Sequence, residues 1–184
     1  MTVIIDGSGT ITGAATLATT VASPTLTTPI VTTTIGVGGA TPSASGSGVT
    51  FPATQSASTD ANTLDDYEEG TWTPTATSQG GSITSYSSSG AYTKIGRIVF
   101  LQATITLTNV GTATGQLSLT NAPFSAATTY SYNNLVQEST LTGLFYASYL
   151  APSSTVLATS NLTNGAITWT NSSTYRYSLT YMTT

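Results

Sequence analysis

The sequence contains neither cysteine nor histidine, and these two absences exclude most enzyme and metal chemistry. Without cysteine, the chain cannot form a disulfide, a thiol nucleophile or a thiolate metal site. Without histidine, it lacks the usual general base of enzymes and the commonest metal ligand, and a Ser-His-Asp triad cannot be built. We therefore predict that the protein is not an enzyme and that it binds no cofactor and no metal.

Charge is also scarce. Only 5% of the 184 residues are charged, against about 25% in a typical soluble protein. Seven acidic and three basic residues leave a net charge of −4, which argues against nucleic acid as a partner. Because Thr, Ser, Gly, Ala and Asn replace the missing charges, we expect either that much of the surface faces other protein copies or that the particle is rigid and unusually stable.

Long apolar runs are missing as well. No segment approaches the roughly 18 apolar residues that a membrane helix needs, so no membrane insertion is expected. The N-terminal residues lack the basic and apolar regions of a secretory signal. We therefore expect the chain to be made and assembled in the cytoplasm of a cell.

Residues 1–61 form a low-complexity segment of Thr, Ser, Ala and Gly. Its apolar residues follow no helical spacing, and four prolines exclude a central sheet strand. Such a segment buries too little apolar surface to fold by itself. It is either a disordered linker or an extended arm or shaft that folds on another protein or around identical copies, and we favour the arm.

Residues 62–184 have the alternating pattern of β-strands. In the segment 97–107 five apolar residues, from Val99 to Leu107, alternate on one face, while Gln102, Thr104 and Thr106 occupy the other. The segment 174–182 places three tyrosines and a leucine on one face. The expected inward-facing residues of these two strands are Val99, Leu101, Ala103, Ile105, Leu107, Tyr175, Tyr177, Leu179 and Tyr181.

Turn signals between these segments predict hairpins. The glycine-rich stretch 109–115 is expected to return the chain into a strand at 116–120, and Pro123 and Phe124 then close that hairpin. Asn164-Gly165 predicts a hairpin that joins 154–162, with its strand at 154–160, to a strand at 165–170, and 141–150 is a further strand candidate. Short strands at regular spacing indicate an all-β fold, an antiparallel β-sandwich or jelly-roll-like knob over residues 62–184, with no helix longer than a turn.

One stretch, NTLDDYEEGTWTP at 62–74, differs from the rest because it concentrates acidic residues: Asp65, Asp66, Glu68 and Glu69. A glycosidase pair normally comes from different elements across a cleft, and a calcium loop needs alternating ligands. We favour a structural joint between arm and knob. In this interpretation Gly70 permits a tight turn, Trp72 anchors in the core, and the acids pair with Lys94 and Arg97 of the same or a neighbouring chain.

Residues 61–75 (ANTLDDYEEGTWTPT), 90–107 (GAYTKIGRIVFLQATITL) and 117–124 (LSLTNAPF) together resemble a module of virion fibre proteins from tailed bacteriophages. The resemblance covers roughly residues 60 to 125, and residues 1–61 are similar in composition to the repetitive shafts of such proteins. It implies a trimeric, non-enzymatic β-module displayed on the virion, and it carries over no catalytic residue. Where the family often has Gly-Leu-Pro-Phe, this chain has Asn121-Ala122-Pro123-Phe124.

Three functions are considered, of which the first two are consistent with the resemblance and the third, an enzyme, belongs to a different class. The first is a short fibre or spike whose arm attaches it to other virion proteins of capsid or tail and whose knob contacts a host surface glycan or protein. The alternative is a capsid-decorating (cement) protein whose arm lies on the major capsid subunits, and the third is a polysaccharide depolymerase. The aromatic residues Trp169, Tyr175, Tyr177 and Tyr181 are expected to serve a trimer core or, less favoured, sugar stacking.

Overall fold

A computed structural model of the chain describes residues 30–31, 33–129, 131–160 and 167–183. These residues contain β-strands and no helix, which confirms the predicted all-β class. Within them, no helix is long and apolar enough to cross a membrane. The strands are β1 (Thr34–Gly36), β2 (Gly48–Thr50), β3 (Tyr67–Trp72), β4 (Thr75–Gly80), β5 (Ser85–Ile95), β6 (Ile98–Asn109), β7 (Thr114–Thr120), β8 (Tyr132–Glu138), β9 (Phe145–Leu150), β10 (Leu157–Ser160) and β11 (Ser173–Met182).

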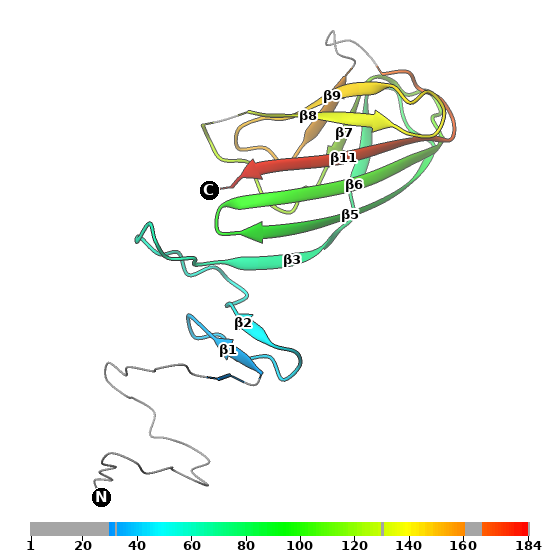
Figure 1. Cartoon of the computed structure of the whole chain (residues 1–184). Helices are drawn as coiled ribbons and strands as arrows, with labels where there is room; N and C mark the ends of the chain where they lie inside the picture. The colour runs from blue at the N-terminus through cyan, green and yellow to red at the C-terminus, as the bar shows by residue number, and fades with distance from the viewer. Residues whose placement is uncertain (1–29, 32, 130, 161–166, 184) are drawn as a thin grey trace, which may run out of the picture.

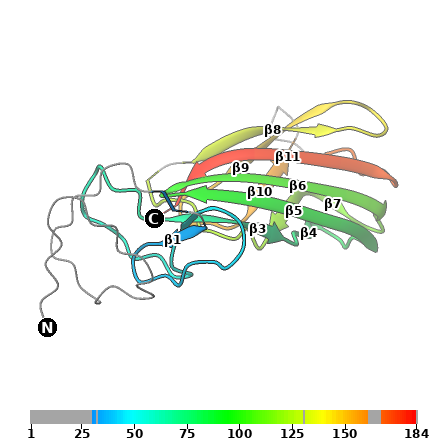
Figure 2. The same cartoon turned by 60° about the horizontal axis from the view of Figure 1, so that its bottom comes forward.

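Nine strands form one antiparallel sheet in the order β3-β5-β6-β11-β8-β9-β10-β7-β4. The first and last strands of this order, β3 and β4, are consecutive in the chain and are joined only by Thr73 and Pro74. The sheet therefore curls on itself, with β3, β5, β6, β11, β8 and β9 following one another in one layer and β10, β7 and β4 behind it (Figures 1 and 2). The Ser88 hydroxyl donates to the Pro74 carbonyl at 2.7 Å and holds the crossing in place.

The core lies between the two layers and follows the predicted alternation. The predicted inward residues of β6 and β11 are all buried, with Val99, Ile105, Leu107 and Tyr175 completely enclosed. From the other layer, Leu117 and Leu119 of β7 are also fully buried, as predicted. At about 1.5–3 kcal/mol for each large apolar side chain, this alternation supplies much of the stabilisation of the curled sheet.

The predicted hairpin between residues 97–107 and 116–120 is wrong. β6 lies between β5 and β11, whereas β7 lies between β10 and β4, so the two strands belong to different layers. The glycine-rich stretch after β6 thus carries the chain across the core instead of returning it beside β6. An alternating pattern specifies which face of a strand is buried but not which strand pairs with it, and that is where the prediction failed.

The second predicted hairpin, between 154–160 and 165–170, is not formed either. Its turn residues 164–165 lie outside the described residues, and residues 167–170 form no strand. β10 is already paired on both sides, by β9 and by β7. Ile167 nevertheless packs its buried side chain into the core from a loop. Its N–H donates to the Gly115 carbonyl at 3.2 Å.

The described part of the predicted arm contains one small element. β1 and β2 pair in parallel, with Ile35 opposite Val49, and Figure 1 shows this pair beyond the β3 edge of the sheet. Both side chains remain about half exposed, at 48% and 51%. Two three-residue strands bury little apolar surface, so this element gains little stability from its own contacts.

Candidate functional site

The predicted joint contains one buried ion pair. The Lys94 ammonium contacts a carboxylate oxygen of Asp66, and the two side chains are only 5% and 7% exposed. Lys94 also donates to the Gln55 side-chain oxygen at 3.4 Å and lies 5.6 Å from the centre of the Phe124 ring. The pair and its neighbours therefore join the strand β5 to Gln55 in the predicted arm and to Phe124 in the loop after β7.

Two further hydrogen bonds involve the acidic residues of the joint, one with the predicted arm and the other with the end of the sheet. Asp65 accepts from the Ser58 N–H at 2.9 Å, and this bond holds the pKa of the Asp65 carboxyl below its usual range. The Gly96 N–H, in the turn between β5 and β6, donates to the Asp66 carbonyl at 2.8 Å. Residues 55–66 are thus anchored at the β5–β6 turn before β3 begins.

The two glutamates of the motif bind tyrosine hydroxyls rather than cations. Glu68 accepts from the Tyr92 hydroxyl at 2.5 Å, and this hydrogen bond, with burial, raises the pKa of Tyr92 to about 12. Glu69 accepts from the Tyr67 hydroxyl at 2.9 Å. Within the described residues neither glutamate is in a salt bridge, so their pairing with a neighbouring chain stays a prediction.

Arg97 lies in the β5–β6 turn and donates from Nε to the Thr183 carbonyl at 3.2 Å. It therefore ties the end of β11 to this turn. In the described part of the chain it makes no ion pair with the acidic motif, so the predicted intrachain pairing with both cations is formed by Lys94 alone.

Trp72 and Gly70 interlock β3 with β5 through two aromatic–glycine pairs. Trp72 lies opposite Gly90 and is 9% exposed, with its indole N–H donating to the Gln102 carbonyl at 3.1 Å. A Cβ on Gly90 would lie 2.1 Å from the indole nitrogen, and one on Gly70 would lie 2.8 Å from the Tyr92 hydroxyl. The prediction that Gly70 permits a tight turn is wrong, because it lies inside β3 and leaves room for an aromatic ring.

The aromatic residues near the C-terminus belong to the core of the single chain. Tyr175, Tyr177 and Tyr181 are at most 3% exposed, and Trp169 packs partly buried against the same core. For the three tyrosines, the expectation that these rings form a trimer core or stack on sugar is therefore wrong, because the inward face of β11 is already covered by the second layer. For Trp169, which is only partly buried, it stays a prediction.

The outer face of the β3-β5-β6-β11-β8-β9 layer carries an apolar row at the end where the arm is anchored. Tyr67 pairs with Ile95, Ile95 with Ile98, and Ile98 with Met182, so the four residues form one line across four strands. Each of these side chains remains between 38% and 42% exposed. We call these four residues the apolar row. Phe100, two residues further along β6, is 47% exposed beside it.

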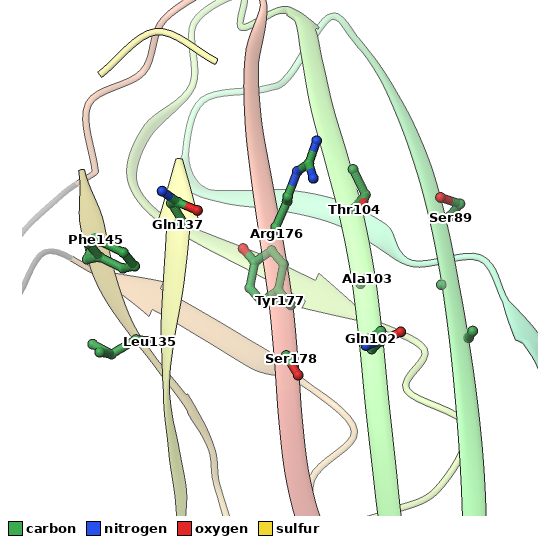
Figure 3. Close-up of a pocket in the computed structure, with 12 residues that line it drawn as sticks. Ser89, Gln102, Ala103, Thr104, Leu135, Gln137, Phe145, Arg176, Tyr177 and Ser178 are labelled. Carbon is green, nitrogen blue, oxygen red and sulfur yellow. The ribbon is translucent and has the colours of Figure 1, made fainter. Parts of the chain in front are cut away.

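The middle of the same outer face holds a shallow depression with a volume of about 560 Å³. A second cross-strand line runs through it, and Figure 3 shows its side chains next to one another. We call this line the polar row, and its members, in order from β5 to β9, are Ser89, Thr104, Arg176, Gln137 and Phe145.

Arg176 is the only cation in this depression. Its side chain is exposed, and in the described residues it takes part in no ion pair. Gln102 and Ser178 pair with each other one row further along the strands, and Leu135 lines the depression from β8. The depression therefore combines one guanidinium with hydroxyl and amide groups.

A buried carboxylate holds the edge of the depression in shape. Glu138, at the end of β8, is 1% exposed, and burial by itself would raise its pKa. Hydrogen bonds from the backbone of Thr142 and Thr140, from the Thr142 hydroxyl and from the backbone of Leu141 outweigh burial and lower the pKa of Glu138 to about 2. The loop between β8 and β9, which separates Gln137 from Phe145, is thereby fixed.

The sequence contained a signal for only part of this depression. Gln102 and Thr104 were expected on the outer face of 97–107, and the same alternation places Arg176 and Ser178 outside the buried tyrosines. Phe145 and Ser89 were missed, because neither stands in a pattern that identifies a surface site.

In the described part of the chain, no group of three or more Asp, Glu, His or Cys side chains could hold a metal ion. No family model, no curated protein and no solved structure matches the chain.

Proposed function

We propose that the chain is a non-enzymatic structural protein on the surface of a tailed-phage virion, a short fibre or spike that forms a trimer. Residues 1–61 attach it to other virion proteins, and the β-sandwich projects from the particle. The observation that carries the proposal is the apolar row, which lies at the same end of the sandwich as the anchored arm.

The apolar row supports self-association because large apolar side chains in a line are an interaction surface. Scattered exposed apolar residues are common on soluble proteins, whereas contiguous patches mark contacts with other molecules. The row runs to β3, whose only strand partner in the described residues is β5. The unpaired backbone groups of an edge strand, next to an apolar row, can pair with a second copy of the chain.

The anchored arm supports attachment to a larger particle. The contacts of Asp65 and Asp66 fix the point at which the arm leaves the sandwich. An arm bound to the particle would therefore hold the sandwich in a defined position. The arm itself carries β1 and β2, whose apolar residues stay half exposed. A segment of this composition becomes stably folded only when it binds a partner.

Sedimentation of the full chain tests the trimer. We expect a species of three times the 18.7 kDa chain mass. Ile98→Asp, in the apolar row, should dissociate it because a carboxylate cannot be buried there without a partner. Gln102→Asp, on the same strand and face but outside the row, is the matched control and should leave the trimer intact. A monomeric parent chain would refute self-association.

Imaging and quantitative mass spectrometry of the purified virion test the location. A fibre or spike predicts a few copies at the tail, whereas hundreds of copies on the head would replace the proposal with the capsid-decorating alternative. Absence of the chain from purified virions would refute both.

A further inference from the structure

We propose that the depression on the outer sheet face binds a carboxylate-bearing sugar unit of a polysaccharide, with Arg176 as the carboxylate ligand. The inference deepens the proposed function, on which it rests, because it assigns the host contact to a defined surface and a chemical class. The following observations carry it.

The three cations of the chain have different environments. Lys94 is enclosed in the ion pair with Asp66, and Arg97 donates to the Thr183 carbonyl at the β5–β6 turn. Arg176 lies in the open depression and takes part in no ion pair in the described residues. In a chain with a net charge of −4, this guanidinium is the group best placed to select an anion, and its planar fork matches a carboxylate.

The neighbours of Arg176 fit a ligand rich in hydroxyl groups. Thr104 lies directly opposite it on β6 and Gln137 directly opposite it on β8. Ser89 follows Thr104 on β5, and Gln102 and Ser178 lie one row away. Hydroxyl and amide groups both donate and accept hydrogen bonds, as sugar hydroxyls require.

Phe145 provides an apolar boundary at the far end of the polar row. It is 53% exposed, lies opposite Gln137, and faces the same side of the sheet as Arg176 (Figure 3). An exposed ring next to polar groups suits the amphipathic faces of a sugar. From Ser89 to Phe145 the row crosses four strand spacings, or roughly 19 Å, so it is long enough for several sugar units.

The position of the depression favours a sugar over an acidic peptide. An extended peptide binds a sheet through backbone hydrogen bonds at an open edge. Here β6 and β11 are paired on both sides, so only side chains face the ligand. A ligand that offers many hydroxyl groups uses such a surface better than a peptide backbone does.

The surface is also held in shape before a ligand arrives. The backbone N–H of Thr174, two residues before Arg176, donates to Glu138 at 3.2 Å. The same carboxylate accepts from the Thr142 hydroxyl at 2.8 Å, which fixes the loop that leads to Phe145. Little ordering is therefore needed on binding, which favours affinity.

Calorimetric titration of the full chain tests the site. The probes are tetragalacturonate, a glucuronate tetrasaccharide and sialyllactose, with maltotetraose as the neutral oligosaccharide and hexaglutamate as the acidic peptide. We expect at least one carboxylated oligosaccharide to bind. Maltotetraose and hexaglutamate should each bind at least about tenfold more weakly. The first comparison tests the guanidinium, and the second tests the groups that bind sugar hydroxyls.

Single substitutions localise the binding. Arg176→Ala should lower the affinity at least about tenfold, and Arg176→Lys should restore part of it, because lysine keeps the charge but not the bidentate fork. Ser89→Ala should weaken binding, whereas Ser87→Ala, on the same strand and face but outside the depression, should not. Arg97→Gln removes the same charge elsewhere and should leave the affinity unchanged.

Three results would overturn the inference. These are no heat from any carboxylated oligosaccharide at about 10 mM, unchanged affinity of Arg176→Ala in a chain with an unchanged melting temperature, and hexaglutamate binding as tightly as the sugars. Virion imaging separates this inference from the proposed function, because Arg176→Ala should still be incorporated into particles. A chain absent from virions would refute the proposed function while the binding measurement stands.

Discussion

Replacing Glu138 by glutamine removes a charge that the fold has enclosed in hydrogen-bond donors. The carboxylate accepts from the N–H groups of Thr140 at 2.9 Å, of Thr142 at 2.6 Å and of Thr174 at 3.2 Å. No salt bridge in the described residues balances it. A neutral amide has one accepting oxygen, and its NH₂ group would face N–H donors.

The magnitude follows from the pKa of Glu138, which the fold lowers from the ordinary 4.5 to about 2. A difference of this size corresponds to roughly 3 kcal/mol of stabilisation of the charged form. Because the folded-state pKa lies below the unfolded-state one, this contribution is fully present above about pH 5 and is lost as the pH falls toward 2. Glu138→Gln should therefore lose about 3 kcal/mol near neutral pH.

Urea unfolding of the full chain at several pH values between about 7 and 2.5 measures the effect. The gap in unfolding free energy between the parent chain and Glu138→Gln should shrink as the pH falls, since every other carboxylate titrates in both proteins. Glu69→Gln, at an exposed carboxylate with one tyrosine partner, should change stability by about 0.5 kcal/mol or less.

Two outcomes would refute this reasoning. A loss below about 1 kcal/mol near neutral pH would mean that the donors do not stabilise the charge. A gap that stays constant down to pH 2.5 would mean that the effect of the substitution is steric rather than electrostatic. In either case Glu138 would no longer explain why the loop before Phe145 is held in place.

Three further comparisons test the packing. Asp66→Asn should lower the unfolding free energy by about 3–5 kcal/mol, because it leaves the Lys94 ammonium buried without its partner. The double change Asp66→Leu/Lys94→Met should lower it far less in the same urea titration. Equal losses would contradict a buried ion pair. Trp72→Ala should cost about 3–5 kcal/mol, and a thermal shift equivalent to less than about 1 kcal/mol would place the indole outside the core. Tyr146→Phe should leave stability unchanged or slightly raised, because the buried Tyr146 hydroxyl has no partner in the described structure. Tyr181→Phe should cost about 1 kcal/mol, because it loses a 2.8 Å hydrogen bond to a backbone carbonyl. A larger loss for Tyr146→Phe than for Tyr181→Phe would refute this assignment of hydrogen-bond partners.

The joint, the apolar row and the polar row lie on different parts of one layer of the sheet. The inner face of this layer carries the core and the Asp66–Lys94 pair, whereas the outer face carries the apolar row at the arm end and the polar row in the middle. Ile98 and Thr104 lie on the same strand six residues apart, or roughly 20 Å in an extended strand. The proposed self-association and the proposed ligand binding therefore use separate parts of one surface.

The alternation of residues was enough to identify several strands and their buried faces. Leu101 and Tyr177 point inward because side chains two residues apart lie on the same side of a strand, whatever its neighbours are. The lack of cysteine and histidine likewise restricts the possible chemistry through composition alone. Alternation is a local property, so one segment of sequence determines it.

Only the tertiary structure decided which strands are neighbours. β5 is rich in serine and shows little apolar alternation, yet it is a strand because β3 and β6 offer hydrogen-bond partners on both sides. The polar row brings Ser89, Arg176 and Phe145 together from segments that are far apart in the chain. Their proximity depends on the register of antiparallel pairs, and register is set by packing across the whole core, which no single segment encodes.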